Sequence, residues 1–249
     1  MHFQSPRTKG SAGVSLHARV LDQIGQAIVR GDLLPGDPLP NADDWSASYG
    51  VSRTVLREVI KVLAGKGMVE SRPKIGTRIR DRNEWNFLDP DVLAWRYGTT
   101  TDFADARALF ELRRTIEPMA GSLAAQRATR AEVDHLQKLY DRMELCVDDN
   151  DRFADADLDF HQAILRMTGN ELFGSLAALT ETAMLISFRL SDDNPFGQRP
   201  SLPLHKRVCD CIAAHDSTGA GQALTELLDM AEADVSRSLE ARARRARGG

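Results

Sequence analysis

The sequence contains only three cysteines in 249 residues, and it has no apolar run long enough to cross a bilayer and no secretory signal. Small secreted domains depend on several disulfides, and a membrane-spanning helix needs about 20 consecutive apolar residues. We therefore expect a cytoplasmic protein that has neither a disulfide framework nor a membrane partner.

Charge is divided unevenly along the chain. Residues 1–82 contain 13 Lys and Arg against 8 Asp and Glu, whereas the remaining residues contain 19 against 28. A basic region binds a polyanion such as nucleic acid more favourably than an acidic region does. The length and the 42% hydrophobic content are sufficient for two domains with buried cores. We expect residues 1–15 to form a mobile tail ahead of the basic domain.

Residues 16–80 follow the order helix, short helix, turn, helix. Apolar residues recur at helical spacing over 16–30, and Gly31 ends that helix. A loop rich in Pro, Gly and Asp follows, and a short helix near 42–49 ends at a glycine. The next helix occupies about 52–63. This order predicts a helix-turn-helix.

The helix at 52–63 carries three cations, Arg53, Arg57 and Lys61, at intervals of four residues. This spacing places them on one helical face, and apolar residues elsewhere supply a packing face. Ser52 can cap the helix start, where free backbone N–H groups can hold a phosphate oxygen. The pattern fits a DNA-reading helix, and it also fits a solvated amphipathic helix.

Residues 67–80 form two short alternating runs around a turn, which indicates a small β-wing. Together with Leu39-Pro40 and the run Val51-Ser52-Arg53-Thr54-Val55-Leu56-Arg57-Glu58, this region resembles the winged helix of GntR-type transcriptional regulators. The resemblance implies double-stranded operator DNA as a partner, contacted by Ser52, Arg53, Arg57, Lys74 and Gly76. We also expect DNA contacts from Thr54, Lys61 and Arg72, which lie on the same helix and wing. The chain departs from the pattern at Asn41-Ala42-Asp43, which places an acid where fatty-acid-responsive members carry an arginine. A phosphate contact is not expected there, and the operator sequence can differ.

Residues 81–98, which join the two expected domains, carry Trp85 and Trp95, two of the three tryptophans. A free linker is usually polar and poor in aromatics. These aromatics can clamp the two domains into a packed joint, or they can simply cap a core. The run from Trp85 to Trp95 also resembles the corresponding segment of GntR-type repressors that respond to galactonate and related sugar acids, which implies a ligand of that class.

From Phe103 onward, apolar residues recur every three or four positions, and no alternating strand pattern is present. Later helices are expected near 171–190, 202–215 and 220–244, with turn residues between them. We therefore expect residues 99–249 to form an antiparallel all-helical bundle, with a cavity if it binds a small ligand. The predicted fold class is mainly α, with the winged helix-turn-helix and its small β-wing ahead of the bundle.

Asp157 and His161 lie four residues apart on one predicted helix, and His205 opens another. This spacing puts the first two on one face, either as metal ligands or as an ordinary helix pair. The surrounding sequences resemble the FCD ligand domain of the FadR subfamily. That resemblance implies one divalent metal, Zn, Ni or Mn, held by an Asp and three His, with the effector bound by the same residues.

The chain departs from this ligand set because residues 222–245 contain no histidine. Loss of a nitrogen ligand weakens the expected metal site. An oxygen of Asp229, Glu232 or Asp234 can substitute. His215 lies too near a helix end to be an obvious replacement, and Cys209 is interpreted as core packing.

Arg113 lies in the run Glu111 to Glu117. In the resembled family the Arg of this pattern points into the effector cavity, so Arg113 is expected to clamp a ligand carboxylate with two hydrogen bonds. The alternative is an ion pair within its own helix, for example with Glu117, which contributes little when exposed. A buried Arg without an anionic partner is costly, so an Arg113 that faces the cavity requires an anion there.

These observations predict a homodimeric transcriptional repressor rather than an enzyme. Each subunit is expected to bind one half-site of a pseudo-palindromic operator, and a small carboxylate held by the Arg113, Asp157, His161 and His205 set is expected to shift the heads away from DNA. Two alternatives stay open. One is a metal-dependent hydrolase built on Asp157, His161 and His205, although no nucleophile or general base accompanies them. The other is an architectural DNA-binding protein without a ligand.

Overall fold

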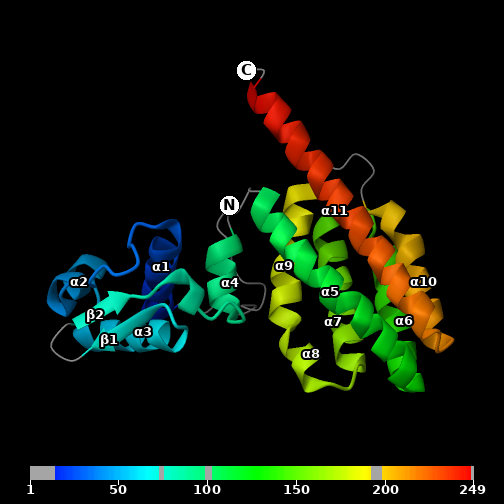
Figure 1. Cartoon of the computed structure of the whole chain (residues 1–249), viewed down its shortest axis with the longest axis horizontal. Coiled ribbons are helices and arrows are strands. Elements are labelled where there is room, and N and C mark those ends of the chain that lie inside the picture. Colours follow the sequence, from blue (N-terminus) through cyan, green and yellow to red (C-terminus); the bar gives the residue numbers. More distant parts are fainter. Residues whose placement is uncertain (1–14, 73–75, 99–102, 192–197, 248–249) are drawn as a thin grey trace. The chain divides into compact units, whose positions relative to one another are not determined.

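The computed structural model describes residues 15–72, 76–98, 103–191 and 198–247. The chain divides into two compact units, Met1–Thr99 and Thr100–Gly249 (Figure 1). Helices dominate both units in the described ranges, and one two-stranded sheet lies in the first. The predicted fold class is therefore confirmed. The predicted tail lies outside the described residues except for Ser15.

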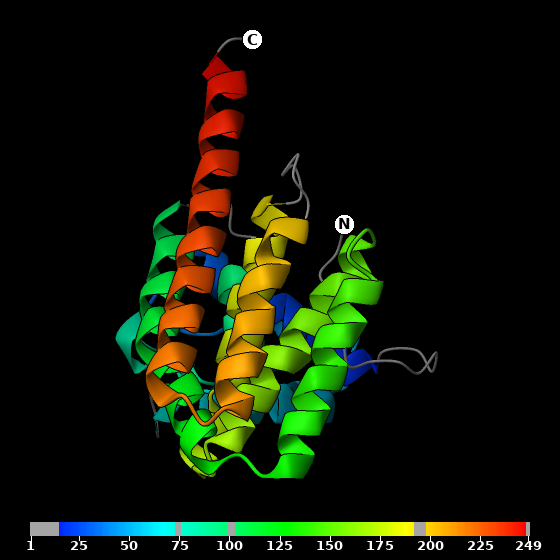
Figure 2. The ribbon, with the colours of Figure 1, turned by 90° about the vertical axis from the view of Figure 1, so that its right-hand side faces the viewer.

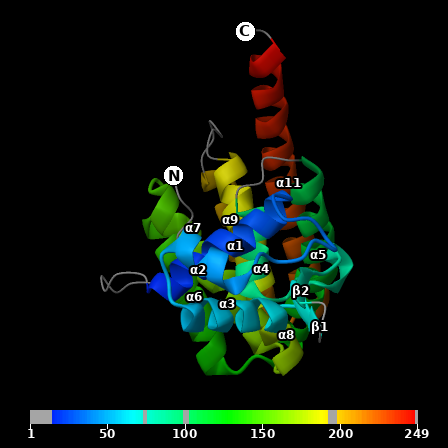
Figure 3. The ribbon, with the colours of Figure 1, turned by 90° about the vertical axis from the view of Figure 1, so that its left-hand side faces the viewer.

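The first unit has the order of a winged helix-turn-helix (Figure 3). Its elements are α1 (Leu16–Arg30), α2 (Ala42–Tyr49), α3 (Arg53–Gly65), β1 (Val69–Arg72), β2 (Gly76–Ile79), the 3₁₀ turn η1 (Arg82–Glu84) and α4 (Pro90–Tyr97). The strands pair antiparallel, from Val69 opposite Ile79 to Arg72 opposite Gly76.

Capping residues set the limits of the first helices. The Ser15 hydroxyl accepts a hydrogen bond from the Ala18 N–H at the start of α1, and Gly31 ends this helix with a φ of 82°. Gly50 ends α2 in the same left-handed conformation, with a φ of 64°. Glycine adopts this conformation without the steric penalty of a side chain, which explains why a glycine ends each helix.

The segment that follows the wing packs into the first unit. Trp85 and Trp95 belong to the same buried cluster as the apolar residues of α1 and α3. The Trp95 indole lies against Gly25 and donates to Asp22 over 2.8 Å. At the end of α3, the buried Lys66 ammonium lies 2.7 Å from a carboxylate oxygen of Asp89. Of the two roles considered for these aromatics, the cap of a core is the one observed.

The second unit is a bundle of helices. They are α5 (Phe103–Arg127), α6 (Arg130–Leu145), α7 (Asn150–Met167), α8 (Glu171–Ser175), α9 (Ala177–Ser191), the 3₁₀ turn η2 (Arg199–Ser201), α10 (Leu202–Ala213) and α11 (Ser217–Arg247). The helices expected near 202–215 and 220–244 correspond to α10 and α11. The single helix expected near 171–190 is instead two, α8 and α9.

Helix α7 contributes more residues to the bundle core than any other described helix. It packs against α5, α6 and α9, and its buried residues include Phe153, Phe160, Ile164 and Leu165. Helix α11 runs beside α5 and α10, and its last turns extend beyond them (Figure 2). Polar groups on α7 that face inward therefore lie in an apolar environment. Among the described residues, no helix combines the length and the apolar character needed to cross a membrane.

The contact between Gly25 and Trp95 gives a test of the packing of α4. Gly25→Ala should lower the free energy of unfolding of the first unit by about 1–3 kcal/mol, because a methyl group there would meet the Trp95 ring at 2.5 Å. All three tryptophans lie in this unit, so urea denaturation followed by tryptophan fluorescence reports on it. Gly65→Ala is the control, because nothing lies within 4 Å of its added methyl group. Equal stability of the two variants would contradict the packing.

Candidate functional site

Helix α3 presents a polar, cationic face away from its buried side. Its buried residues are the apolar Leu56, Val59 and Leu63, and its exposed residues include Arg53, Thr54, Arg57 and Lys61. The exposed Ser52 precedes the helix and accepts a hydrogen bond from the Val55 N–H over 3.3 Å. The cap aligns the first backbone N–H groups, which is the arrangement that holds phosphate at a helix start.

Three of the four described cations expected to contact DNA already have an acidic partner. The pairs are Arg53 with Asp43, Lys61 with Glu58 at 2.7 Å between Nζ and Oε1, and Arg72 with Glu70 at 2.9 Å between Nε and Oε1. Arg57 makes no ion pair within the described parts of the chain. Exposed pairs are weak, so Lys61 and Arg72 can exchange their acids for phosphate. Arg57 is therefore the one of these four cations whose charge no acid engages in the described parts of the chain.

The wing is described on both strands but not at its tip. Gly76 opens β2 with a φ of 95° and is exposed, with open space where a side chain would lie. The Ser71 and Thr77 hydroxyls form a hydrogen bond of 2.8 Å across the two strands. Lys74, which was expected to contact DNA, lies outside the described residues.

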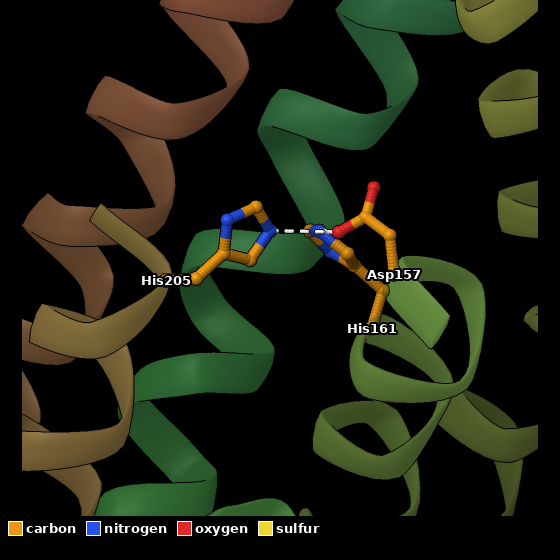
Figure 4. A group of neighbouring side chains, drawn as sticks. All are labelled: Asp157, His161 and His205. Carbon is orange, nitrogen blue, oxygen red and sulfur yellow. Dashed lines mark hydrogen bonds and ion pairs between the residues drawn. The ribbon is translucent and has the colours of Figure 1, made fainter. Parts of the chain in front are cut away.

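A second group of polar residues lies inside the bundle, where Asp157 and His161 of α7 meet His205 of α10 (Figure 4). All three are buried. His205 Nε2 lies 2.7 Å from Asp157 Oδ1, and His161 Nε2 lies 3.6 Å from the same oxygen. One potential ligand atom from each residue lies within 4.8 Å of the others. The fold therefore brings together the three residues that were predicted as a metal set.

Glu117 of α5 completes this group. Its carboxylate lies 2.6 Å from Arg113 Nε through Oε1 and 2.6 Å from His161 Nδ1 through Oε2. Burial acts to raise the pKa of Glu117, but Arg113 and His161 outweigh burial and lower that pKa to about 2. Glu117 is therefore a buried carboxylate that stays ionised and accepts hydrogen bonds from both neighbours.

These contacts determine which imidazole nitrogens are donors. The ionised Glu117 can only accept, so His161 Nδ1 donates to it. His205 Nδ1 donates to the backbone carbonyl of Ser201, 2.9 Å away. In the neutral form, both rings therefore direct the lone pair of Nε2 toward Asp157. A lone pair that faces a carboxylate oxygen needs a cation between them, either a proton or a metal ion.

Asp157 carries the negative charge that would attract such a cation. Burial acts to raise the pKa of Asp157, but the nearby His205, His161 and Arg113 hold it below its usual value. The site thus offers one carboxylate oxygen and two imidazole nitrogens, each with its second nitrogen hydrogen-bonded outside the set. Zinc, nickel and manganese all accept such ligands.

Arg113 lines the cavity beside the metal set, and it is buried. Its guanidinium holds Glu117 through Nε at 2.6 Å and through Nη2 at 3.4 Å. The anion that a buried arginine requires is therefore present in its own helix, and this intrahelical pair is buried rather than exposed. In the sequence, Glu117 stands out only as this alternative partner of Arg113, and no pattern there indicates its contact with His161.

The cavity beside these residues has a volume of about 60 Å³. Its wall is mostly apolar, and the residues that line it outside the charged group include Phe153, Met184, Phe188, Leu227, Leu228, Met230 and Ala231. This volume holds a few water molecules, whereas pockets for small organic ligands usually exceed about 300 Å³.

Of the substitutes considered for the third histidine, only Asp234 lines the cavity. It forms an ion pair with Arg237, and it is not part of the close metal set. Asp229 and Glu232 pair with Arg114 instead. Cys209 lies in the hydrophobic core, as interpreted from the sequence, and burial raises the pKa of its thiol to about 12, so it supplies no thiolate.

Two family models match the chain, one on each unit. The gntR family of bacterial regulatory proteins matches residues 16–79, and the FCD domain matches residues 108–230. An uncharacterised HTH-type transcriptional regulator of Escherichia coli K12, YieP, is 33% identical over 211 residues, which cover 83% of this chain and 90% of that protein. The galactonate operon transcriptional repressor of the same organism is 29% identical over 211 residues, covering 84% and 92%.

Solved structures agree with this fold. The Listeria monocytogenes protein Lar, which controls expression of the agr system, superposes with a TM-score of 0.65 at 16% identity, covering 91% of this chain and 99% of that one. A GntR regulator from Rhodococcus sp. RHA1 gives a TM-score of 0.50 at 25% identity, covering 89% and 98%. The chain therefore belongs to the gntR family of bacterial regulatory proteins, as a DNA-binding transcriptional regulator whose second domain is an FCD domain.

Proposed function

We propose that this regulator is a homodimeric repressor whose operator affinity is controlled by a small carboxylate of the sugar-acid class, bound in the FCD domain beside a divalent metal. The observation that carries the proposal is the buried charged group that faces the cavity. An arginine, a glutamate, an aspartate and two histidines in an apolar interior are costly unless they serve a ligand or one another. This group also argues against a purely architectural protein.

The metal would be held by Asp157, His161 and His205. The fixed tautomers support this assignment, because each ring already directs Nε2 inward and binds a second group through Nδ1. When bound, the metal supplies a positive charge that an effector carboxylate can coordinate. The missing third histidine leaves room for such an oxygen ligand.

The sugar-acid class is supported by the similarity to the galactonate operon repressor. A sugar acid does not fit in about 60 Å³, so its binding has to displace flexible side chains such as Met184, Phe188 or Met230. The ligand and the repacking of the bundle are then linked, which is what effector control requires. The two relatives described above are transcriptional regulators, so they give no support to the hydrolase alternative.

Operator binding should depend on Arg57, the cation of α3 that forms no ion pair with any described residue. Arg57→Ala should weaken operator binding by about 1–3 kcal/mol, because a base or phosphate contact is lost and no buried partner is left behind. Gel-shift titration at a fixed salt concentration measures the change. Arg130→Ala, which removes an exposed arginine from α6 of the second unit, is the control. Equal affinities of the two variants would contradict the assignment of Arg57.

Metal binding should depend on Asp157. Asp157→Asn keeps the shape of the side chain but removes its charge, so the purified protein should lose most of the metal that the wild type carries. Elemental analysis measures the metal content, and the loss of stabilisation by added Zn, Ni or Mn in a thermal-shift assay checks it independently. Asp159→Asn removes an exposed charge from the same helix and serves as the control. A wild-type protein that takes up none of these metals would refute the metal site.

The effector response should depend on the forked guanidinium of Arg113. Arg113→Lys retains a cation beside the buried Glu117, so the fold should survive, but it cannot bind a carboxylate with two parallel hydrogen bonds. We expect the thermal shift by galactonate and related aldonates to disappear, together with the release of operator DNA, while operator affinity without ligand stays unchanged.

The control for this experiment is the neighbouring residue. Arg114→Lys changes an arginine that is partly exposed and paired with Asp229 and Glu232 outside the cavity. Its effector response should equal that of the wild type. Loss of the response in both variants would show that the effect does not come from the cavity, and the absence of any shift in the wild type would refute the sugar-acid class.

A further inference from the structure

The ion pair between Asp43 and Arg53 joins the two helices of the helix-turn-helix. Asp43 lies in the first turn of α2, and Arg53 is the first residue of α3. The contact is made by Oδ1 of Asp43 and Nε of Arg53. Both side chains stay largely exposed, 49% for Asp43 and 66% for Arg53. The pair therefore lies at the start of α3, on its solvent-exposed side.

Stability does not account for this contact. Exposed ion pairs contribute little to folding, because water screens the charges and two side chains lose freedom. An acid beside the DNA face also opposes a phosphate, which makes it unfavourable for affinity. The effect of a carboxylate at this position is therefore sought in the orientation of the Arg53 side chain.

The ion pair with Asp43 is made through Nε of Arg53, and the outer N–H groups of its guanidinium form no hydrogen bond within the described parts of the chain. An arginine that reads guanine uses a planar fork, and the direction of the fork determines which base it meets. A free arginine side chain samples many rotamers, whereas one that forms an ion pair with a nearby carboxylate samples fewer of them. Arg57, four residues further along the same face, makes no ion pair in the described parts of the chain.

We propose that Asp43 is a positioning residue for Arg53 and that it determines, through this contact, which base pair of the operator half-site Arg53 selects. The proposal rests on operator binding by α3. Asp43 itself touches neither the base nor the backbone of DNA. Its effect is on sequence preference, whereas Arg57 contributes mainly to affinity.

The adjacent Asp44 provides a matched control. Asp43 and Asp44 both lie in the first turn of α2 and both are exposed. Each carries a charge that favours the N-terminus of the helix and repels phosphate. Only Asp43 forms an ion pair with Arg53. Any general effect of charge should appear with both residues, and an effect through Arg53 should appear with Asp43 alone.

The experiment selects bound sequences from a duplex library with randomised half-sites, using the full-length wild type, Asp43→Asn and Asp44→Asn. Both variants should bind all sequences somewhat more tightly, because each loses a negative charge. Only Asp43→Asn should also lose discrimination at one base pair of each half-site, by about ten-fold, the size expected for one arginine–guanine contact. Unchanged base preferences in Asp43→Asn, or the same change in both variants, would overturn the proposal.

A second comparison separates positioning from direct reading of the base. In the Arg53→Ala background, Asp43→Asn should cause no further change in base preference, since the residue through which it acts is gone. A change that persists would mean that Asp43 reads the base itself, which overturns the positioning role. A wild type that selects no sequence would instead refute operator binding, and with it this inference.

Discussion

The buried carboxylate of Glu117 is the group on which the interior of the FCD domain depends. An ionised carboxylate in an apolar bundle requires donors on both of its oxygens, and Arg113 and His161 supply them. In return, Glu117 neutralises Arg113 and fixes the tautomer of His161. The inward lone pair of His161 and its direction toward Asp157 follow from this contact. One carboxylate on α5 therefore organises side chains on both α5 and α7.

The two functional regions of the chain use charge in opposite ways. Inside the bundle, each charged group has a partner and little water, so removing one member leaves a charge uncompensated. On α3 and the wing, the ion pairs of Lys61 with Glu58 and of Arg72 with Glu70 are exposed and weak, and these cations can exchange an acid for a phosphate. The first region is suited to a fixed geometry around a small ligand. The second is suited to contacts that form and break as the protein moves along DNA.

Patterns in the sequence predicted the helices, the wing and the grouping of Asp157, His161 and His205, because periodicity and spacing report directly on helical faces. They did not predict the break between α8 and α9 at Leu176, although Gly174 lies two residues before it. The ion pair of Asp43 with Arg53 was also missed. It depends on the geometry of the turn between two helices, which residue spacing along one helix does not encode. Glu117 was recognised only as a neighbour of Arg113 in the sequence, because its contact with α7 is tertiary.

The small volume of the cavity determines how the second unit can respond to a ligand. A volume of about 60 Å³ is too small for a sugar acid, so the site accepts one only if residues of α9 or α11 move. Interiors are close-packed, and an inserted ligand therefore shifts whole helices rather than single atoms. Arg113 and Glu117 both lie on α5, which is the first helix of the second unit and the one that follows the DNA-binding unit in the chain. A change in the contact between Arg113 and Glu117 is therefore a change within the helix that directly follows the DNA-binding unit in the sequence.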